Sequence, residues 1–118
     1  LDAMSERAPE WDFSSNEDEV LRQVVKRLAP LSPRLVMLFG SRALGRAQKD
    51  SDYDLLVIMD LAEPDAPRSV PVRRLLRGLG VPFDIIVYTP EEWESYRRHP
   101  LALAHRIERE GRVLLGAA

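Results

Sequence analysis

Apolar positions along this chain follow two patterns, a helical period and short unbroken runs. The helical period first appears on one face at Val20, Leu21, Val24, Val25 and Leu28. Ser14 to Glu17 has the sequence of a capping box, which predicts the start of this helix, and the prolines after Leu28 predict its end. The same reasoning predicts helices over Arg68–Leu79, from the capping box Thr89–Glu92 to about Arg98, and over about Leu101–Glu110.

The unbroken apolar runs predict strands between these helices. The predicted strands are Leu35–Phe39, which is apolar throughout, Asp52–Met59, which is polar at its start and apolar after, and Phe83–Tyr88, while Val113–Leu115 is a candidate edge strand. Leu35–Phe39 is apolar at every position, which is typical of a strand covered on both faces. Residues 60–67 contain acidic residues and two prolines, and we expect an exposed loop there. The order of elements predicts an α/β (α+β) domain with a small mixed sheet flanked by helices.

Length and composition limit the classes of protein that the chain can represent. At 118 residues we expect one domain over residues 14–118. Residues 1–13 show no sustained period and Leu1–Ala3 precede Met4, so we expect a disordered or tag-derived segment there. The 17 basic and 19 acidic side chains nearly balance, so we expect no direct binding of long nucleic acid. The absence of cysteine excludes disulfides, thiol nucleophiles and thiolate zinc sites. No apolar run reaches membrane-spanning length and no signal-peptide pattern opens the chain, so we expect a cytoplasmic protein without membrane association.

Three aspartates lie at the starts of two predicted strands. Asp52 and Asp54 begin the second strand, and Asp84 lies near the start of the third. Alternate residues of a strand face the same way, about 6.6 Å apart. Carboxylates so placed can share hard cations such as Mg²⁺, and phosphoryl-transfer sites hold two ions roughly 4 Å apart. Without a cation, the three carboxylates would repel one another and one would take up a proton.

A glycine and a serine follow the first predicted strand. Gly40 has no Cβ, so the backbone there can approach a phosphate closely. Ser41, at the first turn of a short helix, offers a hydroxyl and free N–H groups to an anion. Arg42 comes next and is a candidate either for a phosphate contact or for a surface ion pair. The tail phosphates of a nucleoside triphosphate are therefore expected at Gly40–Ser41.

Convergence of these residues predicts the pairing of the strands. Gly40–Ser41 can meet Asp52 only if the first two strands are antiparallel. Asp84 can meet Asp54 only if the third strand is parallel to the second. The Arg68–Leu79 helix is then the crossover connection, which is expected to be right-handed.

The spacing Gly40-Ser41, ten residues, Asp52-x-Asp54 resembles the signature of the polymerase-beta nucleotidyltransferase superfamily. The stretches Leu38–Ala43 and Asp50–Leu55 look most like its minimal nucleotidyltransferase branch, and Phe83–Ile86 resembles the strand that carries the family's third carboxylate. The resemblance covers about Asn16 to Leu115. It implies a polymerase-beta-like nucleotidyltransferase fold and Mg²⁺-dependent transfer of a nucleotide from a triphosphate to a hydroxyl, with release of pyrophosphate.

The resemblance also assigns roles to individual residues. Gly40 and Ser41, with Arg42 beside them, would bind the nucleotide, with ATP as the substrate. Asp52 and Asp54 would bind both Mg²⁺ ions, and Asp84 would bind the catalytic ion and help to deprotonate the attacking hydroxyl. Members of the minimal branch are often antitoxins, whose partner is an all-helical HEPN ribonuclease toxin that receives AMP on a tyrosine.

The sequence leaves open two alternatives to an enzyme that transfers AMP to a partner protein. The chain could neutralise a partner by binding alone, with a vestigial nucleotide site. It could also transfer a nucleotide to a small-molecule hydroxyl, although no residue specifies a pocket for one. In the resemblance, antibiotic- or tRNA-modifying relatives hold their acceptors with an extra helical domain. We expect no such domain in these 118 residues, which favours an acceptor brought by a partner protein.

Overall fold

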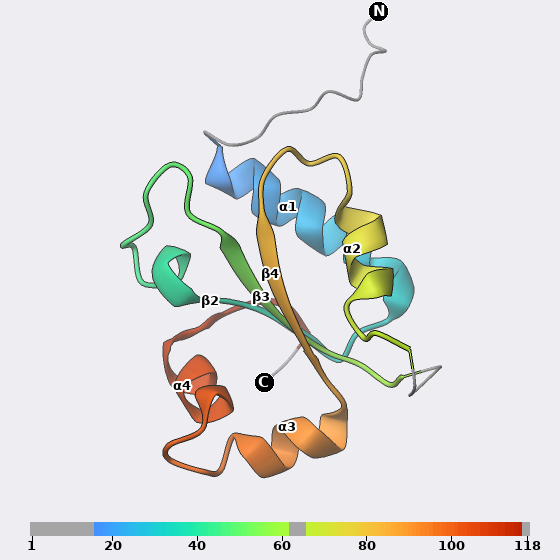
Figure 1. Cartoon of the computed structure of the whole chain (residues 1–118), viewed down its shortest axis with the longest axis vertical. Coiled ribbons are helices and arrows are strands. Elements are labelled where there is room, and N and C mark those ends of the chain that lie inside the picture. The colour runs from blue at the N-terminus through green and yellow to red at the C-terminus, as the bar shows by residue number, and fades with distance from the viewer. Residues whose placement is uncertain (1–15, 62–65, 117–118) are drawn as a thin grey trace, which may run out of the picture.

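A four-stranded mixed sheet in the order β4-β3-β2-β5 organises the structure, a computed structural model that describes residues 16–61 and 66–116 (Figure 1). Its strands are β2 (Leu35–Phe39), β3 (Tyr53–Ile58), β4 (Phe83–Tyr88) and β5 (Arg112–Gly116). β2 is antiparallel to both β3 and β5, whereas β3 and β4 are parallel. The predicted small mixed sheet, its strand directions and its edge strand are confirmed.

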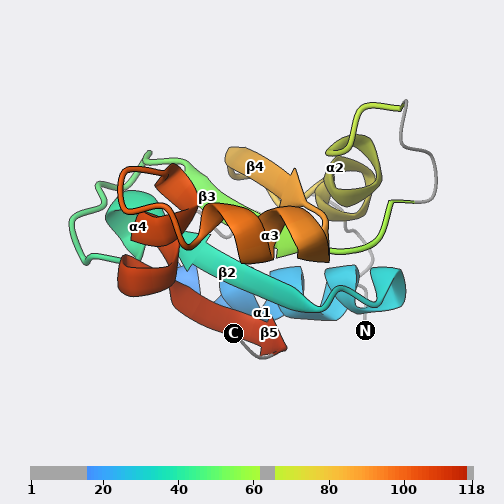
Figure 2. The same ribbon diagram turned by 90° about the horizontal axis from the view of Figure 1, so that it is seen from below.

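Helices cover both faces of the sheet (Figure 2). α1 (Glu17–Leu28) and α2 (Val70–Leu76) pack on one face, against the β-strand residues Val36, Leu38, Tyr53, Leu55 and Val57. α3 (Pro90–Tyr96) and α4 (Leu103–Glu110) pack on the other face, against Leu35, Met37, Leu56 and Ile58. Because side chains alternate along a strand, Asp54 shares the α3–α4 face with Leu56.

The first helix begins later than the sequence predicted. The N-cap is Asn16, whose side chain accepts a hydrogen bond of 3.1 Å from the backbone N–H of Glu19. The predicted cap, Ser14, lies outside the described residues. Four of the predicted apolar positions are buried, and the fifth, Val25, is only half-buried. A short 3₁₀ helix (Ala29–Leu31) ends the segment at Pro30, as predicted.

The prediction for the crossover helix, Arg68–Leu79, was too long at both ends. α2 covers Val70–Leu76, with Pro71 in its first turn as predicted. Arg68 lies in the preceding turn, where its guanidinium binds the carboxylate of Glu92 at 2.6 and 3.0 Å. At the other end Arg77 is extended and Gly78 has a φ of 90°, so the helical hydrogen bonds stop there.

The two C-terminal helices are also shorter than predicted. The capping box between Thr89 and Glu92 is present and opens α3, which ends at Tyr96 rather than near Arg98. α4 begins at Leu103 rather than Leu101 and ends before Gly111, as expected. Consecutive turns and bends around Pro100 separate α3 from α4. Pro100 has no N–H to donate, so a continuous helix cannot pass through it.

The loop expected over residues 60–67 is described only in part. Its first and last residues, Asp60 and Pro67, are exposed, while residues 62–65 lie outside the described part of the chain. No helix in the ranges 16–61 and 66–116 combines the length and the apolar character that a membrane crossing requires.

Candidate active site

Three segments that are distant in sequence meet at one end of the sheet. β2 ends at Phe39, whose partner in β3 is Asp54, and Asp54 is in turn paired with Asp84 of β4. A short 3₁₀ helix, η2 (Gly40–Arg42), directly follows β2. The predicted convergence of Gly40, Asp54 and Asp84 is therefore confirmed, because antiparallel and parallel pairing bring one strand end and two strand starts together.

Gly40 lies against the carboxylate of Asp54. Its φ is 74°, and a Cβ added to it would overlap the Oδ2 atom of Asp54. From the sequence we expected Gly40 to let a phosphate approach the backbone closely. The structure shows a second reason for glycine, since any side chain would displace Asp54.

The carboxylates at this end of the sheet influence one another electrostatically. Burial of the side chain raises the pKa of Asp54 above its ordinary value, and the negative charges of Asp84 and Asp52 raise it further. Asp52 and Asp84 are exposed, and Asp54 is half-buried. The site therefore holds three acidic groups, and the environment of the central one, Asp54, disfavours its ionised form.

Divalent cations suit this donor set, although the side chains do not surround one point. Among the described residues, no three histidine, cysteine, aspartate or glutamate side chains are gathered closely enough to hold a metal ion as they stand. The oxygen donors Asp52, Asp54 and Asp84 nevertheless share one sheet end, and a hard cation prefers such ligands. The charge of a cation bound beside Asp54 would offset the repulsion from Asp84 and Asp52 that contributes to its raised pKa.

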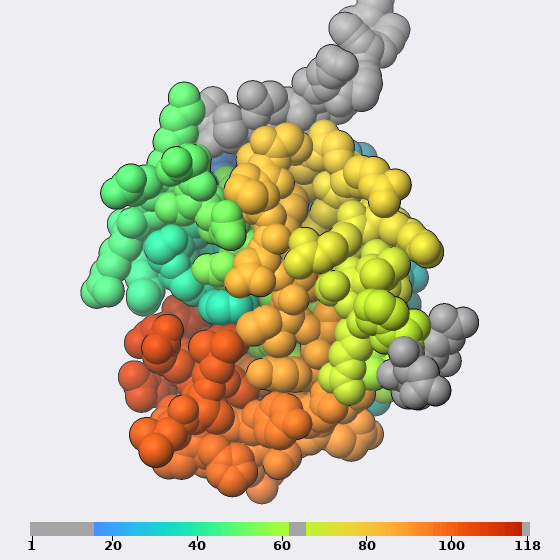
Figure 3. Space-filling model, in the orientation of Figure 1, coloured from blue at the N-terminus to red at the C-terminus, as the bar shows by residue number. Residues whose placement is uncertain are grey.

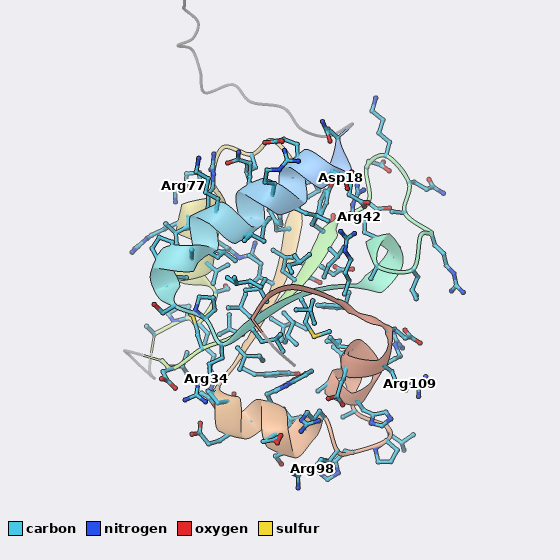
Figure 4. All side chains as sticks on the ribbon, turned by 180° about the vertical axis from the view of Figure 1, so that it is seen from behind. Asp18, Arg34, Arg42, Arg77, Arg98 and Arg109 are labelled. Carbon is cyan, nitrogen blue, oxygen red and sulfur yellow. The ribbon has the colours of Figure 1, made fainter. Side chains whose placement is uncertain are left out.

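Arg42 extends from η2 towards the loop before β3 rather than into solvent. Its guanidinium donates to the carbonyl oxygens of Gln48, Lys49 and Ser51, and it forms an ion pair of 3.3 Å with Glu17 at the start of α1 (Figure 4). Only 8% of its side chain is exposed. Of the two interpretations open from the sequence, the ion pair is present, and the nucleotide contact stays a prediction.

Tyr53 is a residue of this region that the sequence did not single out. It lies between Asp52 and Asp54, is fully buried, and its hydroxyl has no hydrogen-bond partner within the described structure. The guanidinium carbon of Arg42 lies 3.9 Å from the centre of its ring, and the Phe83 ring lies 5.7 Å away. Tyr53 thus joins the site to the core formed by α1 and α2.

We expect Tyr53→Phe to stabilise the protein by about 1 kcal/mol, because it removes a buried hydroxyl that has no partner among the described residues. The phenylalanine ring keeps the packing beneath Arg42. Urea unfolding monitored by circular dichroism measures the change, and Tyr96→Phe, at an exposed tyrosine, serves as the neutral control. A loss of stability in Tyr53→Phe would show that the hydroxyl is satisfied in solution.

The carboxylate end of the sheet reaches the molecular surface. In the space-filling view the green residues before and at the start of β3 meet the golden residues of β4 on one face, with the residues of η2 beside them (Figure 3). The exposure of Asp52 and Asp84 agrees with this view. A nucleotide and a second substrate can therefore approach the aspartates from solvent.

Comparison with solved structures shows the same fold in two other proteins. One is described as a toxin–antitoxin crystallised with AMP-PNP, with a TM-score of 0.59 and 22% identity over 82% of this chain and 73% of that one. The other is a candidate nucleotidyltransferase from Sulfolobus solfataricus, with a TM-score of 0.56 and 19% identity over 94% and 90% of the two chains. No curated protein matches the sequence.

A family model defines the relationship more closely than these structures do. The model described as the nucleotidyltransferase domain matches residues 18–103. This range spans most of the chain and includes Gly40, Ser41 and all three aspartates of the sheet end. The protein therefore belongs to the nucleotidyltransferase domain family.

Proposed function

We propose that this protein transfers AMP from ATP to a hydroxyl group of a partner protein and thereby acts as an antitoxin. The observation that carries the proposal is the pairing of Asp54 with Asp84 on adjacent parallel strands, directly beside Gly40. Membership of the nucleotidyltransferase domain family supports the class of reaction. The three residues meet only because of the fold, and together they supply carboxylates and an open backbone in one place.

The proposed chemistry assigns one task to each segment of the site. Gly40 and Ser41 bind the triphosphate through backbone N–H groups and the serine hydroxyl. Asp52, Asp54 and Asp84 hold two Mg²⁺ ions, which when bound supply positive charge to the phosphates and lower the pKa of the acceptor hydroxyl. The bond between the α-phosphorus and the bridging oxygen breaks, pyrophosphate leaves, and the acceptor oxygen bonds to the α-phosphorus. Asp84 accepts the proton of the acceptor hydroxyl.

The nature of the acceptor is inferred from the comparisons and the resemblance. One structural neighbour is described as a toxin–antitoxin with AMP-PNP, which supports an adenine nucleotide and a toxin partner. The resemblance to the minimal nucleotidyltransferase branch points to a HEPN ribonuclease and to one of its tyrosines. A protein acceptor also suits the exposed position of Asp52 and Asp84, because a folded partner can reach them.

Mass spectrometry of the partner tests this proposal. The product of the neighbouring gene is co-expressed with the wild-type protein, with Asp52→Ala/Asp54→Ala and with Asp60→Ala, an exposed aspartate just beyond the opposite end of β3. We expect the partner to gain one or more AMP units with the wild type and Asp60→Ala, and none with the double variant. If the partner stays unmodified but still co-purifies with the wild type, the proposed enzyme activity is wrong and the protein acts as an antitoxin through binding alone.

A further inference from the structure

Arg42 is a buried cation that binds the loop joining η2 to β3. Its Nε donates to the carbonyl oxygen of Ser51 at 3.2 Å, and its Nη2 donates to the same oxygen at 2.8 Å. Nη2 also approaches the carbonyl oxygens of Gln48 and Lys49, each at 3.3 Å. Nη1 pairs with Glu17, so all three nitrogens of the guanidinium are engaged.

The contacts of Arg42 lie on both sides of Asp52. The carbonyl of Ser51 belongs to the peptide that joins Ser51 to Asp52, so holding this oxygen holds the backbone of the aspartate. On the other side, the ring of Tyr53 lies beneath the guanidinium. Asp52 itself precedes β3, which begins at Tyr53, and the peptide that joins the two residues donates from the Tyr53 N–H to the carbonyl oxygen of Pro82 at 2.9 Å. The backbone of Asp52 is therefore held on one side by this hydrogen bond and on the other side by the loop.

The loop has few other restraints on its path. Gln48 and Ser51 bond to each other through N–H to Oγ and N–H to carbonyl contacts of 2.8 and 3.0 Å. The backbone N–H of Arg46 donates to the carbonyl of Ser41 at 2.8 Å. Most residues between Leu44 and Asp50 are exposed. Among the described contacts, Arg42 is thus the one side chain that links Asp52's backbone to the core.

We propose that Arg42 is a positioning residue that holds Asp52 in register with Gly40–Ser41 and Asp54 for metal binding. This role rests on the proposed nucleotidyl transfer, in which Asp52 is a metal ligand. Because the backbone of Arg42 is part of η2, its guanidinium keeps the Gly40–Ser41 turn and Asp52 at a constant separation. Arg42 acts on the reaction through Asp52 and does not touch the nucleotide.

Lysine is the informative replacement for Arg42. A lysine keeps the positive charge, but its ammonium group cannot reproduce the planar set of donors or the stacking on Tyr53. If Arg42 were a phosphate ligand, Arg42→Lys would keep much of the affinity for ATP. If Arg42 positions Asp52, the lysine variant should resemble Arg42→Gln. Arg46→Gln is the matched control, because Arg46 lies in the same loop with an exposed side chain.

Two measurements on the full-length protein test the proposal without requiring transfer to a partner. Hydrogen exchange of the amides in residues 46–52, without nucleotide, reports on the loop, and titration with Mn²⁺ monitored by electron paramagnetic resonance reports on the metal ligands. For Arg42→Lys and Arg42→Gln we expect exchange about 10-fold faster in the loop and Mn²⁺ affinity reduced roughly 10- to 100-fold. Arg46→Gln should leave both readouts at the wild-type level.

Each outcome supports or overturns the positioning role. Unchanged loop exchange in Arg42→Lys would overturn it. So would wild-type Mn²⁺ affinity combined with weaker binding of ATP but not of AMP, since that result would place Arg42 on the outer phosphates. If both predicted changes occur while the wild type modifies no partner, the positioning role stands and the proposed function fails. A wild type that binds no Mn²⁺ would count against both the function and the metal-positioning role.

Discussion

Replacing Asp54 by asparagine should abolish nucleotidyl transfer and, in metal-free protein at pH 7, raise the melting temperature. Activity is lost because asparagine removes a charged ligand shared by the two proposed cations. Stability rises because the ionised carboxylate of Asp54 is partly buried beside Asp84 and Asp52, and this environment raises its pKa in the folded state. Loss of activity together with a gain in stability is the signature of a site whose charges repel until a cation is bound.

The pH dependence of this effect has a definite sign. A carboxylic acid whose pKa is raised by folding favours the folded state below its unfolded pKa, and this contribution is lost as the pH rises through the folded value. The stability advantage of Asp54→Asn over the wild type should therefore be absent near about pH 3 and grow towards pH 7. Thermal unfolding in EDTA across this range measures it, with Asp60→Asn as the control at an exposed site.

Divalent cations should reverse the order of stability at neutral pH. A ligand that binds only the folded state stabilises it, by about 2.7 kcal/mol when its concentration is 100 times its dissociation constant. Mg²⁺ or Mn²⁺ should thus raise the melting temperature of the wild type and have little effect on Asp54→Asn. A metal-free Asp54→Asn variant that melts well below the wild type at pH 7 would contradict this account of the site.

Gly40→Ala should inactivate the protein and destabilise it more than Gly45→Ala, a change at a second loop glycine of similar φ. The φ of 74° is strained for alanine, at a cost of about 1–3 kcal/mol. In addition, the new methyl group overlaps the Oδ2 atom of Asp54, so the carboxylate must leave its present position. Both the fold and the metal ligand are therefore affected by one methyl group.

Gly45→Ala separates these two causes. Gly45 has a similar φ of 72°, but a Cβ added to it meets no atom within 4 Å. Gly45→Ala should lower the stability through backbone strain alone, and the variant should keep its metal affinity and transfer activity. Thermal unfolding and Mn²⁺ titration of both variants, compared at the same pH, measure the difference. Equal behaviour of the two variants would show that Asp54 does not depend on the missing side chain of Gly40.

Much of the fold follows from local patterns in the chain. The run Leu35–Phe39 is apolar at every position, and as a strand covered on both faces it buries Leu35–Leu38 and partly buries Phe39. Phe83–Tyr88 and the capping box at Thr89 were predicted with the bounds that the structure shows. The directions of the strands also followed from the sequence, because Gly40, Asp54 and Asp84 can meet in only one arrangement.

The ends of several helices were decided by tertiary contacts and backbone geometry. Arg68 continues the helical pattern of α2, but its guanidinium binds Glu92 of α3 and the carbonyl oxygen of Val87. Such partners lie about twenty residues away in the chain, and no local period reveals them. α2 stops at Leu76 because the backbone of Arg77 is already extended, and Gly78 follows with a positive φ. Neither conformation can be read from the sequence pattern.

The spacing of Gly40-Ser41 and Asp52-x-Asp54 predicts the class of site, since it combines an open backbone with carboxylates on one strand face. How these residues are held depends on the way the chain folds in space. The clash between a Cβ at Gly40 and Asp54, the burial of Tyr53 and the contacts of Arg42 with the loop before β3 are all between residues whose separation in space depends on chain folding. Residue type and spacing specify which chemistry is available, whereas packing and hydrogen bonding through space specify where each group is held.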